Sequence, residues 1–344
     1  MKALVMEEYQ RLSYKDVHTP KLHGAHDVRI RIKAVAICGS DVHGFDGSTG
    51  RRQPPVIMGH EAAGDIVEVG EAVTAFSVGD RVTFDSTIYC GSCRFCRSGD
   101  VNLCDNRRVL GVSCDEYRQD GAFAEFVVVP DHIVYRMPNG LSYVEAALAE
   151  PAAVAAHAFR LTPVGLDESV AVFGAGLIGL LLIQILRASS SGPIVALDTD
   201  AKRRDTALAF GADVALDPSD PALVQKIAAC AGNPFVDRVF EAVGATAPIK
   251  SAISLVRKGG SVTLIGNVSP TIELPLQQVV TRQISLIGSC AMAGEYPLVL
   301  DLMARKKIDV MPLVSAVAPL EEGQAWFTRL YSKEAGLLKV VLEP

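Results

Sequence analysis

The sequence predicts an α/β protein of two domains, one mostly β and one built on a doubly wound parallel sheet. The chain has 344 residues, which is more than one domain usually holds. Short β-branched segments bounded by Gly, Asp or Pro fill the chain up to about residue 135. From Ser169 onward, apolar strands alternate with helical stretches, as in a doubly wound sheet.

The N-terminal part is expected to consist mainly of short strands. MKALVMEEYQ is typical of a strand, VRIRIKAVAIC begins with the alternation of a half-buried strand and ends at Cys38, and AAGDIVEVG, GDRVTFD and FAEFVVVP are similar. The pattern changes at Ser142, which forms a capping box with Glu145 and opens a helix. Because Pro151 disfavours helical geometry in the residue before it, we expect Glu150 at a break between two helices.

Six nearly all-apolar segments then predict strands that are buried on both faces. These segments are SVAVFG, PIVALD, DVALD, VDRVFEAVG, GGSVTLIG and ISLIGS. After Ala291 the chain predicts a helix, a Pro-bearing strand and a final strand, and we expect this tail to rejoin the N-terminal unit. The predicted domains are therefore 1–152 with 291–344, and 153–290.

Composition and charge favour a cytoplasmic protein that acts on a small molecule. The net charge is −6 without a basic block, which argues against nucleic acid as a partner. The apolar run 170–188 approaches the length of a membrane span, but three glycines divide it into a strand, a turn and a helix, so we expect no membrane segment. No secretory signal is visible, and eight cysteines are too few for a disulfide scaffold.

Four of these cysteines predict a closed metal site. They follow the spacing C-x2-C-x2-C-x7-C, at Cys90, Cys93, Cys96 and Cys104. One loop with this spacing can supply four thiolates in the tetrahedral array that structural zinc prefers. An iron–sulfur cluster is the alternative. In bacterial ferredoxins, however, three residues separate the third and fourth Cys and Pro follows the fourth, whereas seven residues separate them here.

A glycine-rich loop predicts a dinucleotide site. GAGLIG follows the apolar segment SVAVF and opens an apolar helix, which is the setting that gives a G-x-G-x-x-G motif meaning. In that setting the pyrophosphate rests on the helix N-terminus. The residues expected to contact the cofactor here are Gly174, Gly176, Leu177, Ile178 and Gly179.

Asp198 predicts that the dinucleotide is NAD rather than NADP. It ends the next strand, nineteen residues beyond Gly179, where an acidic residue meets the ribose hydroxyls. A carboxylate there repels a ribose phosphate. Lys202, Arg203 and Arg204 lie nearby and can weaken this preference, and Arg203 is included in the cofactor site.

A dispersed set of side chains predicts a second, open metal site. Cys38 lies in CGSDVH, His60 and Glu61 in GHE, and Glu150 in EP. Each alone has an ordinary structural explanation, but together they form a zinc ligand set with a vacant position. One thiolate and one carboxylate neutralise Zn²⁺, so we expect one Glu to bind directly and the other to lie just outside or alternate with substrate. We favour Glu61 as the direct ligand.

Such a site predicts alcohol oxidation. A zinc ion lowers the pKa of bound water from 15.7 to about 7, a change of roughly 9 units, or about 12 kcal/mol if an alcohol behaves similarly. No single hydrogen bond supplies that much. Ser40, two residues after Cys38, is expected to accept the substrate proton and pass it to His43 and solvent, while the cofactor takes the hydride.

In order and spacing, the motifs CGSDVH, GHE, the four-cysteine loop, LAEPAAVAAHA and GAGLIG resemble the zinc-dependent medium-chain dehydrogenase/reductase family, over essentially the whole chain. Glu150, where liver-type alcohol dehydrogenases carry Cys, is similar to the sorbitol (polyol) and threonine dehydrogenase branch. The resemblance implies a GroES-like β-barrel catalytic domain with an inserted Rossmann domain. It also implies that Cys38, His60 and Glu61 surround the catalytic zinc, with Glu150 as ligand or near neighbour, that Ser40 and His43 form the relay, and that the protein is a homo-oligomer, with a tetramer favoured over a dimer. The two predicted metal sites together give two zinc ions per chain.

The chain differs from this branch at two positions whose side chains bind the substrate. Sorbitol dehydrogenases carry Tyr where Gly44 stands and Arg where Ala291 stands, so the freed volume is expected to admit a bulkier or less polar secondary alcohol. Threonine dehydrogenases have Thr at the position of Ser40. The expected function is reversible hydride transfer between NAD and a secondary alcohol or polyol. The alternatives are a threonine-like amino-alcohol dehydrogenase and a non-catalytic NAD(H)-binding protein.

Overall fold

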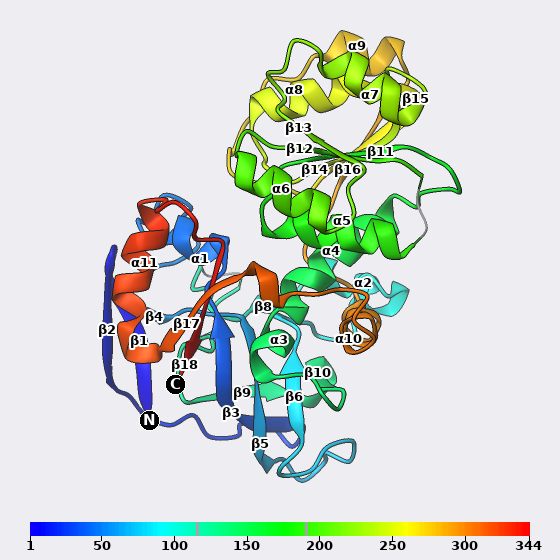
Figure 1. Cartoon of the computed structure of the whole chain (residues 1–344). Coiled ribbons are helices and arrows are strands. Elements are labelled where there is room, and N and C mark those ends of the chain that lie inside the picture. Colours follow the sequence, from blue (N-terminus) through cyan, green and yellow to red (C-terminus); the bar gives the residue numbers. More distant parts are fainter. Residues whose placement is uncertain (115–116, 190–191) are drawn as a thin grey trace. The chain divides into compact units, whose positions relative to one another are not determined.

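The computed structural model describes residues 1–114, 117–189 and 192–344, which form two compact units (Figure 1). The first unit comprises Met1–Glu150, Tyr296–Arg305 and Val310–Pro344, and the second comprises Pro151–Glu295 and Lys306–Asp309. The sequence analysis placed the divisions after residues 152 and 290. In the structure they fall after residues 150 and 295, and a four-residue segment of the tail joins the second unit.

The first unit is built on two β-sheets. A small antiparallel sheet has the order β2-β1-β4, and a larger sheet has the order β10-β6-β5-β3-β18-β17 with β9 paired to β3. The strands of the small sheet are β1 Lys2–Glu8, β2 Arg11–Asp16 and β4 Val56–Ile57. Those of the large sheet are β3 Asp27–Ala36, β5 Glu61–Val69, β6 Arg81–Phe84, β9 Phe126–Pro130, β10 Val134–Arg136, β17 Val314–Pro319 and β18 Lys339–Glu343. Val28, Ile30 and Ile32 alternate inward along β3, as the sequence predicts, and are buried in the core.

The chain tail completes this sheet. β18 pairs antiparallel with β3, where Val341 lies opposite Ala36, and parallel with β17. The expectation that the tail rejoins the N-terminal unit is therefore confirmed. Two helices belong to the tail, α10 (Tyr296–Ala304) and α11 (Gly323–Tyr331). The sequence analysis missed α11, which buries Phe327 with its ring centroid 5.4 Å from that of Phe45.

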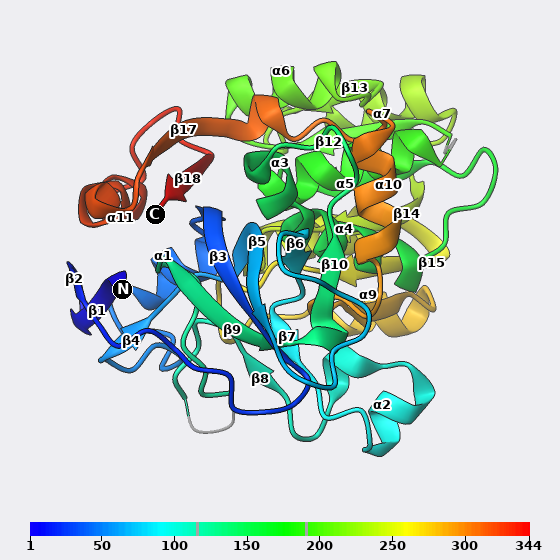
Figure 2. The same cartoon turned by 90° about the horizontal axis from the view of Figure 1, so that it is seen from below.

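Short elements carry the motifs of the first unit. They are α1 Gly39–Gly44, β7 Thr87–Ile88, α2 Arg94–Ser98, β8 Arg108–Val109 and α3 Tyr143–Ala147. Figure 2 shows the segment that contains α2 extending away from β3 and β9. The capping box of Ser142 and Glu145 opens α3 as predicted. The helix break lies at Leu148, however, and Glu150 is already in the first turn of α4 (Ala149–Leu161). Pro151 is the third residue of α4. The N–H groups of the first turn have no partner within the helix, so proline is tolerated there.

The second unit is a doubly wound sheet with six parallel strands in the order β13-β12-β11-β14-β15-β16. The strands are β11 Val170–Phe173, β12 Ile194–Leu197, β13 Val214–Leu216, β14 Val236–Glu241, β15 Val256–Leu264 and β16 Ser285–Gly288. The helices are α5 Leu177–Ala188, α6 Ala201–Ala209, α7 Leu223–Ala231, α8 Thr246–Leu255 and α9 Leu276–Thr281. Figure 1 shows α5 and α6 on one face of the sheet and α7, α8 and α9 on the other. All six predicted strands form, but burial on both faces holds for β11 and β12 and not for the edge strand β16.

The apolar run 170–188 forms β11, the glycine loop and α5, which has 12 residues. Within the described parts of the chain, no helix has the length and apolar character of a membrane span.

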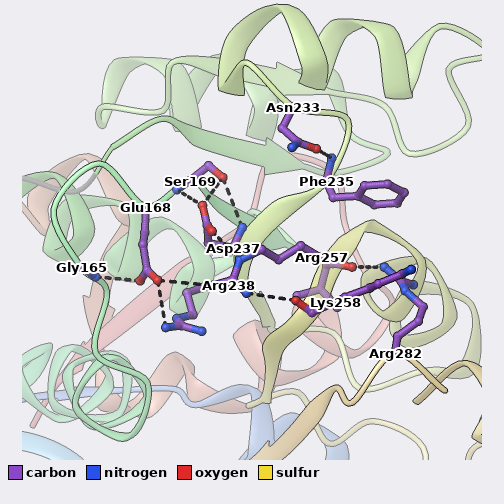
Figure 3. A network of polar contacts seen from close by, with 11 residues as sticks. Gly165, Glu168, Ser169, Asn233, Phe235, Asp237, Arg238, Arg257, Lys258 and Arg282 are labelled. Atoms are coloured by element: carbon purple, nitrogen blue, oxygen red, sulfur yellow. Dashed lines mark hydrogen bonds and ion pairs between the residues drawn. The ribbon is translucent and has the colours of Figure 1, made fainter. Parts of the chain in front are cut away.

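A polar network joins the amino ends of three strands of this sheet (Figure 3). Asp237 at the start of β14 accepts hydrogen bonds from Ser169 Oγ (2.8 Å), before β11, and from Arg257 Nε (2.6 Å) on β15. Arg238 on β14 donates to Glu168 at 2.9 Å. These contacts fix β11, β14 and β15 at the end opposite to the glycine loop, so the carboxyl ends of the strands stay free for a ligand.

Candidate active site

Cys38 lies where β3 gives way to α1, and its side chain serves as the N-cap. The backbone N–H of Ser40 donates to Cys38 Sγ at 3.4 Å, and the Ser40 hydroxyl lies 3.3 Å from the same sulfur. The sulfur therefore accepts two hydrogen bonds at the N-terminus of α1. The predicted metal ligand and the predicted proton acceptor are therefore in direct contact.

Sheet register brings the GHE motif to this cysteine. Ala36 at the end of β3 lies opposite Glu61 at the start of β5. Gly59 has φ +91°, and a Cβ there would lie 2.9 Å from ring atoms of Phe123, so the residue before His60 must be glycine. The ligand atoms of Cys38, His60 and Glu61 all lie within 4.8 Å of one another.

The chemistry of these groups fits a divalent cation. His60 and Glu61 are buried, and His60 Nδ1 lies 3.5 Å from Asp41 Oδ1 without making a hydrogen bond to any residue that the structure describes. Burial raises the pKa of the Cys38 thiol well above its ordinary value, and the charge of Glu61 raises it further. A cation bound among these three groups would stabilise the thiolate and satisfy the imidazole. Zinc accepts this set of sulfur, nitrogen and oxygen donors.

Glu150 lies near this group without belonging to it. Its Oε1 accepts a hydrogen bond from Ser86 Oγ at 3.0 Å. Burial raises the pKa of Glu150 to about 7, although the charge of His60 acts in the opposite direction. The three-residue cluster thus includes Glu61, the ligand that the sequence analysis favoured, and leaves Glu150 as a neighbour.

Lys339 is a site residue that sequence reasoning missed. Its Nζ donates to Glu61 Oε1 and Oε2, at 2.9 and 2.7 Å, and to the carbonyl oxygen of Ile37 at 2.9 Å. Both side chains of this ion pair are almost fully buried. Burial favours a lower pKa for Lys339, but the charges of Glu61, Cys38 and Glu150 and the hydrogen bond to Glu61 together outweigh it, and the pKa is raised. A lysine inside the apolar strand LLKVV was the available signal.

Arg52 is a second missed residue. Its Nη2 donates to Asp41 Oδ1 at 2.9 Å and to Ser40 Oγ at 3.2 Å, and its side chain is only 4% exposed. Arg52 also overturns the expectation of free volume at Gly44. A Cβ on Gly44 would lie 2.7 Å from Arg52 Cγ, so the arginine already fills this space.

His43 lies on α1 with an exposed side chain. Among the described residues no hydrogen bond joins its imidazole to Ser40, so the structure leaves the second step of the expected relay without a direct contact.

The four-cysteine cluster also forms. The sulfurs of Cys90, Cys93, Cys96 and Cys104 lie within 4.8 Å of one another. Backbone N–H groups of Cys90 and Asn106 each donate to Cys104 Sγ at 3.3 Å. A backbone hydrogen bond from Ser92 contributes most to lowering the pKa of Cys90 to about 5, whereas burial raises that of Cys96 to about 12. The loop thus supplies four sulfur donors, which fit a closed tetrahedral zinc site.

The glycine loop follows β11 in the second unit. Gly174 has φ +89°, and a Cβ on Gly179 would lie 1.8 Å from the carbonyl oxygen of Gly174, so neither position accepts a side chain. A Cβ on Gly176, the N-cap of α5, would meet open space. Leu177 and Ile178 are half-buried in the first turn of α5. The N-terminus of α5 therefore has room for a pyrophosphate.

Asp198 directly follows β12 beside this loop. It accepts hydrogen bonds from the N–H of Ala175 at 2.8 Å and of Asp200 at 2.9 Å. Arg203 Nη1 lies 4.0 Å from its carboxylate, whereas Arg204 donates to the backbone oxygen of Asp198 at 2.8 Å. The loop and the predicted ribose-binding carboxylate are thus joined by a hydrogen bond.

Comparison with known proteins agrees with this description. The profile "Alcohol dehydrogenase GroES-like domain" matches residues 24–139, and "Zinc-binding dehydrogenase" matches 178–305. A sorbitol dehydrogenase of Halalkalibacterium halodurans is 34% identical over 349 aligned positions, covering 100% of this chain and 99% of the relative.

Solved structures are similar over the same length. A member of the zinc-binding dehydrogenases from Sinorhizobium meliloti 1021, bound to NADP, has a TM-score of 0.90 and 32% identity, covering 100% of this chain and 99% of that one. An alcohol dehydrogenase from E. coli CFT073, complexed with NADH, has a TM-score of 0.91 and 28% identity with the same coverage. The chain belongs to the zinc-dependent medium-chain dehydrogenase/reductase family, on its polyol dehydrogenase branch. It is an oxidoreductase with a GroES-like domain and a Rossmann-like parallel sheet.

Proposed function

We propose that this chain is a zinc- and NAD-dependent dehydrogenase that interconverts a secondary alcohol of a polyol and the corresponding ketone. The main support is the close approach of Cys38, His60 and Glu61 next to the hydroxyl of Ser40. The family membership and the sorbitol dehydrogenase relative support the substrate class.

In this proposal two zinc ions have different tasks. Cys38, His60 and Glu61 hold the catalytic ion, with Glu150 as an alternative carboxylate beside it. A structural ion is held by Cys90, Cys93, Cys96 and Cys104. When bound, the catalytic zinc supplies positive charge beside the reacting hydroxyl, and the dinucleotide supplies the hydride acceptor.

The protein residues handle the proton. Oxidation removes a hydride, with its electron pair, from the carbinol carbon and a proton from the hydroxyl, so one alcohol and one NAD give one ketone, one NADH and one proton. Ser40 Oγ accepts the hydroxyl proton, and His43, which is exposed, exchanges it with solvent. Lys339 lies 2.7 Å from Glu61 Oε2 and places a positive charge beside this buried carboxylate.

NAD is the proposed cofactor. The N–H groups at the start of α5 hold the pyrophosphate, Gly174, Gly176 and Gly179 let the backbone approach it, and Asp198 accepts the ribose hydroxyls. Related structures contain NADP in one case and NADH in another, so the support for NAD comes from the carboxylate of Asp198. Arg203 is placed beside this ribose.

A substrate panel and metal analysis test the proposal. Sorbitol, other polyols, simple secondary alcohols and L-threonine are each assayed with NAD or NADP by absorbance at 340 nm. We expect turnover of a polyol or secondary alcohol with NAD, and about two zinc ions per chain by mass spectrometry. Turnover of L-threonine alone would favour the amino-alcohol alternative, and active protein without zinc would refute the proposal.

A single substitution separates catalysis from cofactor binding. Cys38→Ser is expected to abolish turnover while NADH binding, measured by fluorescence, survives, because the glycine loop belongs to the other unit. Cys230→Ser on α7 is the matched control and should keep full activity, since Cys230 belongs to neither metal cluster. Full activity of Cys38→Ser, or a non-catalytic wild type that only binds NADH, would refute the proposal.

We further propose a cytoplasmic homotetramer. Cys90, Cys93, Cys96 and Cys104 lie close together as thiols and not as disulfides, as expected in a reducing compartment. Light scattering should give four times the chain mass of 36.6 kDa.

A further inference from the structure

We propose that Arg52 is a positioning residue that fixes the orientation of the Ser40 hydroxyl, and that glycine at position 44 leaves the space that the Arg52 side chain occupies. The inference rests on the proposed role of Ser40 in accepting the substrate proton. It adds a residue that belongs to neither zinc cluster and to no cofactor motif.

One nitrogen of Arg52 serves two acceptors. Nη2 lies 2.9 Å from Asp41 Oδ1 and 3.2 Å from Ser40 Oγ. Asp41 is fully buried and Arg52 nearly so, so the ion pair keeps the guanidinium in one place. Arg52 Nε is buried and unpartnered among the described residues, which leaves the pair with Asp41 and Ser40 as the contacts that hold this group.

A guanidinium can only donate hydrogen bonds. Ser40 Oγ must therefore accept from Arg52, and its own O–H must point elsewhere. In the structure that O–H is directed to Cys38 Sγ at 3.3 Å, toward the candidate metal cluster. Arg52 thus selects one orientation of a hydroxyl that is otherwise free to rotate on an exposed residue.

Gly44 provides the space for this arrangement. It lies in α1 without a left-handed φ, so its backbone accepts any residue. A Cβ at this position, however, would lie 2.7 Å from Arg52 Cγ and 3.3 Å from both Cβ and Cδ of the arginine. Even alanine would therefore push the Arg52 stem away from Ser40. Packing, and not backbone conformation, requires glycine here.

The arrangement matters for proton transfer. During oxidation the O–H bond of the substrate breaks, its proton binds the lone pair of Ser40 Oγ that Arg52 leaves free, and Ser40 in turn releases one proton, which reaches solvent by way of the exposed His43. Arg52 occupies one lone pair of Oγ throughout and directs the other toward the substrate. The positive charge of the guanidinium also stabilises negative charge that develops on the substrate oxygen.

A double-mutant cycle tests the inference. The kcat for the preferred alcohol is measured for the wild type, Arg52→Met, Ser40→Ala and the double variant. Removing Arg52 alone is expected to lower kcat about 10²-fold. The KM values should change less than about twofold, and in the Ser40→Ala background the further loss should stay below about threefold. Arg51→Met is the matched control, because Arg51 is the exposed neighbour, and it should behave like the wild type.

Each other outcome has a defined meaning. The same loss in both backgrounds would show that Arg52 acts independently of Ser40, and an unchanged kcat in Arg52→Met would show that it has no role; either overturns the inference. Wild-type activity of Ser40→Ala would refute the proposed relay itself, and the inference with it. Because this single variant reports on the relay alone, the two failures are distinguishable.

Gly44→Ala tests the same contact without removing the charge, and it carries the test if Arg52→Met fails to fold. We expect a comparable loss of kcat, wild-type zinc content by mass spectrometry, and a crystal structure in which Arg52 has moved away from Ser40. Full activity with a displaced arginine, or loss of zinc in step with the loss of activity, would overturn the inference.

Discussion

Replacing Lys339 by Met should strongly destabilise the first unit, because it leaves the buried Glu61 carboxylate without its partner. The two charges lie 2.7 Å apart, and both side chains are at most 2% exposed. At an effective dielectric constant of 20, unit charges at this distance attract by about 6 kcal/mol. Breaking a buried ion pair costs about 3–5 kcal/mol. For a unit of this size that corresponds to a fall in Tm of about 6–20 °C.

The assay is calorimetry on metal-stripped protein, so that no bound cation compensates Glu61. Lys33→Met is the matched control: it makes the same change on neighbouring β3, where Lys33 lies 3.8 Å from Asp65 and is 39% exposed. Such a surface pair contributes about 0–1 kcal/mol. The double variant Glu61→Gln/Lys339→Met should recover most of the loss. If Lys339→Met lowers Tm no more than the control does, the electrostatic reasoning about this site is wrong.

Three further predictions concern the second unit. Burial opposes ionisation of Glu295, but hydrogen bonds from His157 and a backbone N–H lower the pKa of its carboxyl group. The stabilisation from this carboxylate is therefore present above about pH 4.3 and is lost as pH falls through the lowered pKa. Glu295→Gln should be less stable than the wild type at pH 7, and the difference in Tm should disappear in acid. Asp198→Ala should raise kcat/KM with NADP relative to NAD, and an unchanged ratio would remove Asp198 from the ribose site. Gly179→Ala should abolish NADH binding or folding of this unit, because its Cβ would lie 1.8 Å from a carbonyl oxygen, and tight binding of NADH would contradict this.

Local patterns in the sequence were sufficient to predict most of the fold. The capping box at Ser142 and the six apolar strands all appear in the structure, because each depends on residues close together in the chain. The position of the helix break near Glu150 was predicted two residues late, since Pro151 fits inside a first helical turn as well as before one. Helix α11 was missed because it begins with Gly323, which packs against Leu4 and was not recognised as a helical residue.

The sequence predicted the candidate metal ligands, but not the buried residues that hydrogen-bond to them or to Ser40. Cys38, His60 and Glu61 stand in short motifs that can be read directly, and the register between β3 and β5 brings them together. Lys339 and Arg52 carry no motif. Lys339 reaches Glu61 only because β18 inserts between β3 and β17, and Arg52 reaches Ser40 only because Gly44 leaves room. Such contacts depend on tertiary packing, which no local pattern encodes.

The distance in sequence between Glu61 and Lys339 also sets an order of events during synthesis. The two residues are 278 positions apart, and the whole nucleotide unit lies between them. At ribosomal speeds of about 5–20 residues per second, the lysine follows the glutamate by about 15–55 s. Throughout that interval the nascent first unit lacks both β18 and the counter-charge for the buried carboxylate of Glu61. The large sheet of the first unit can therefore be completed only when translation has nearly finished.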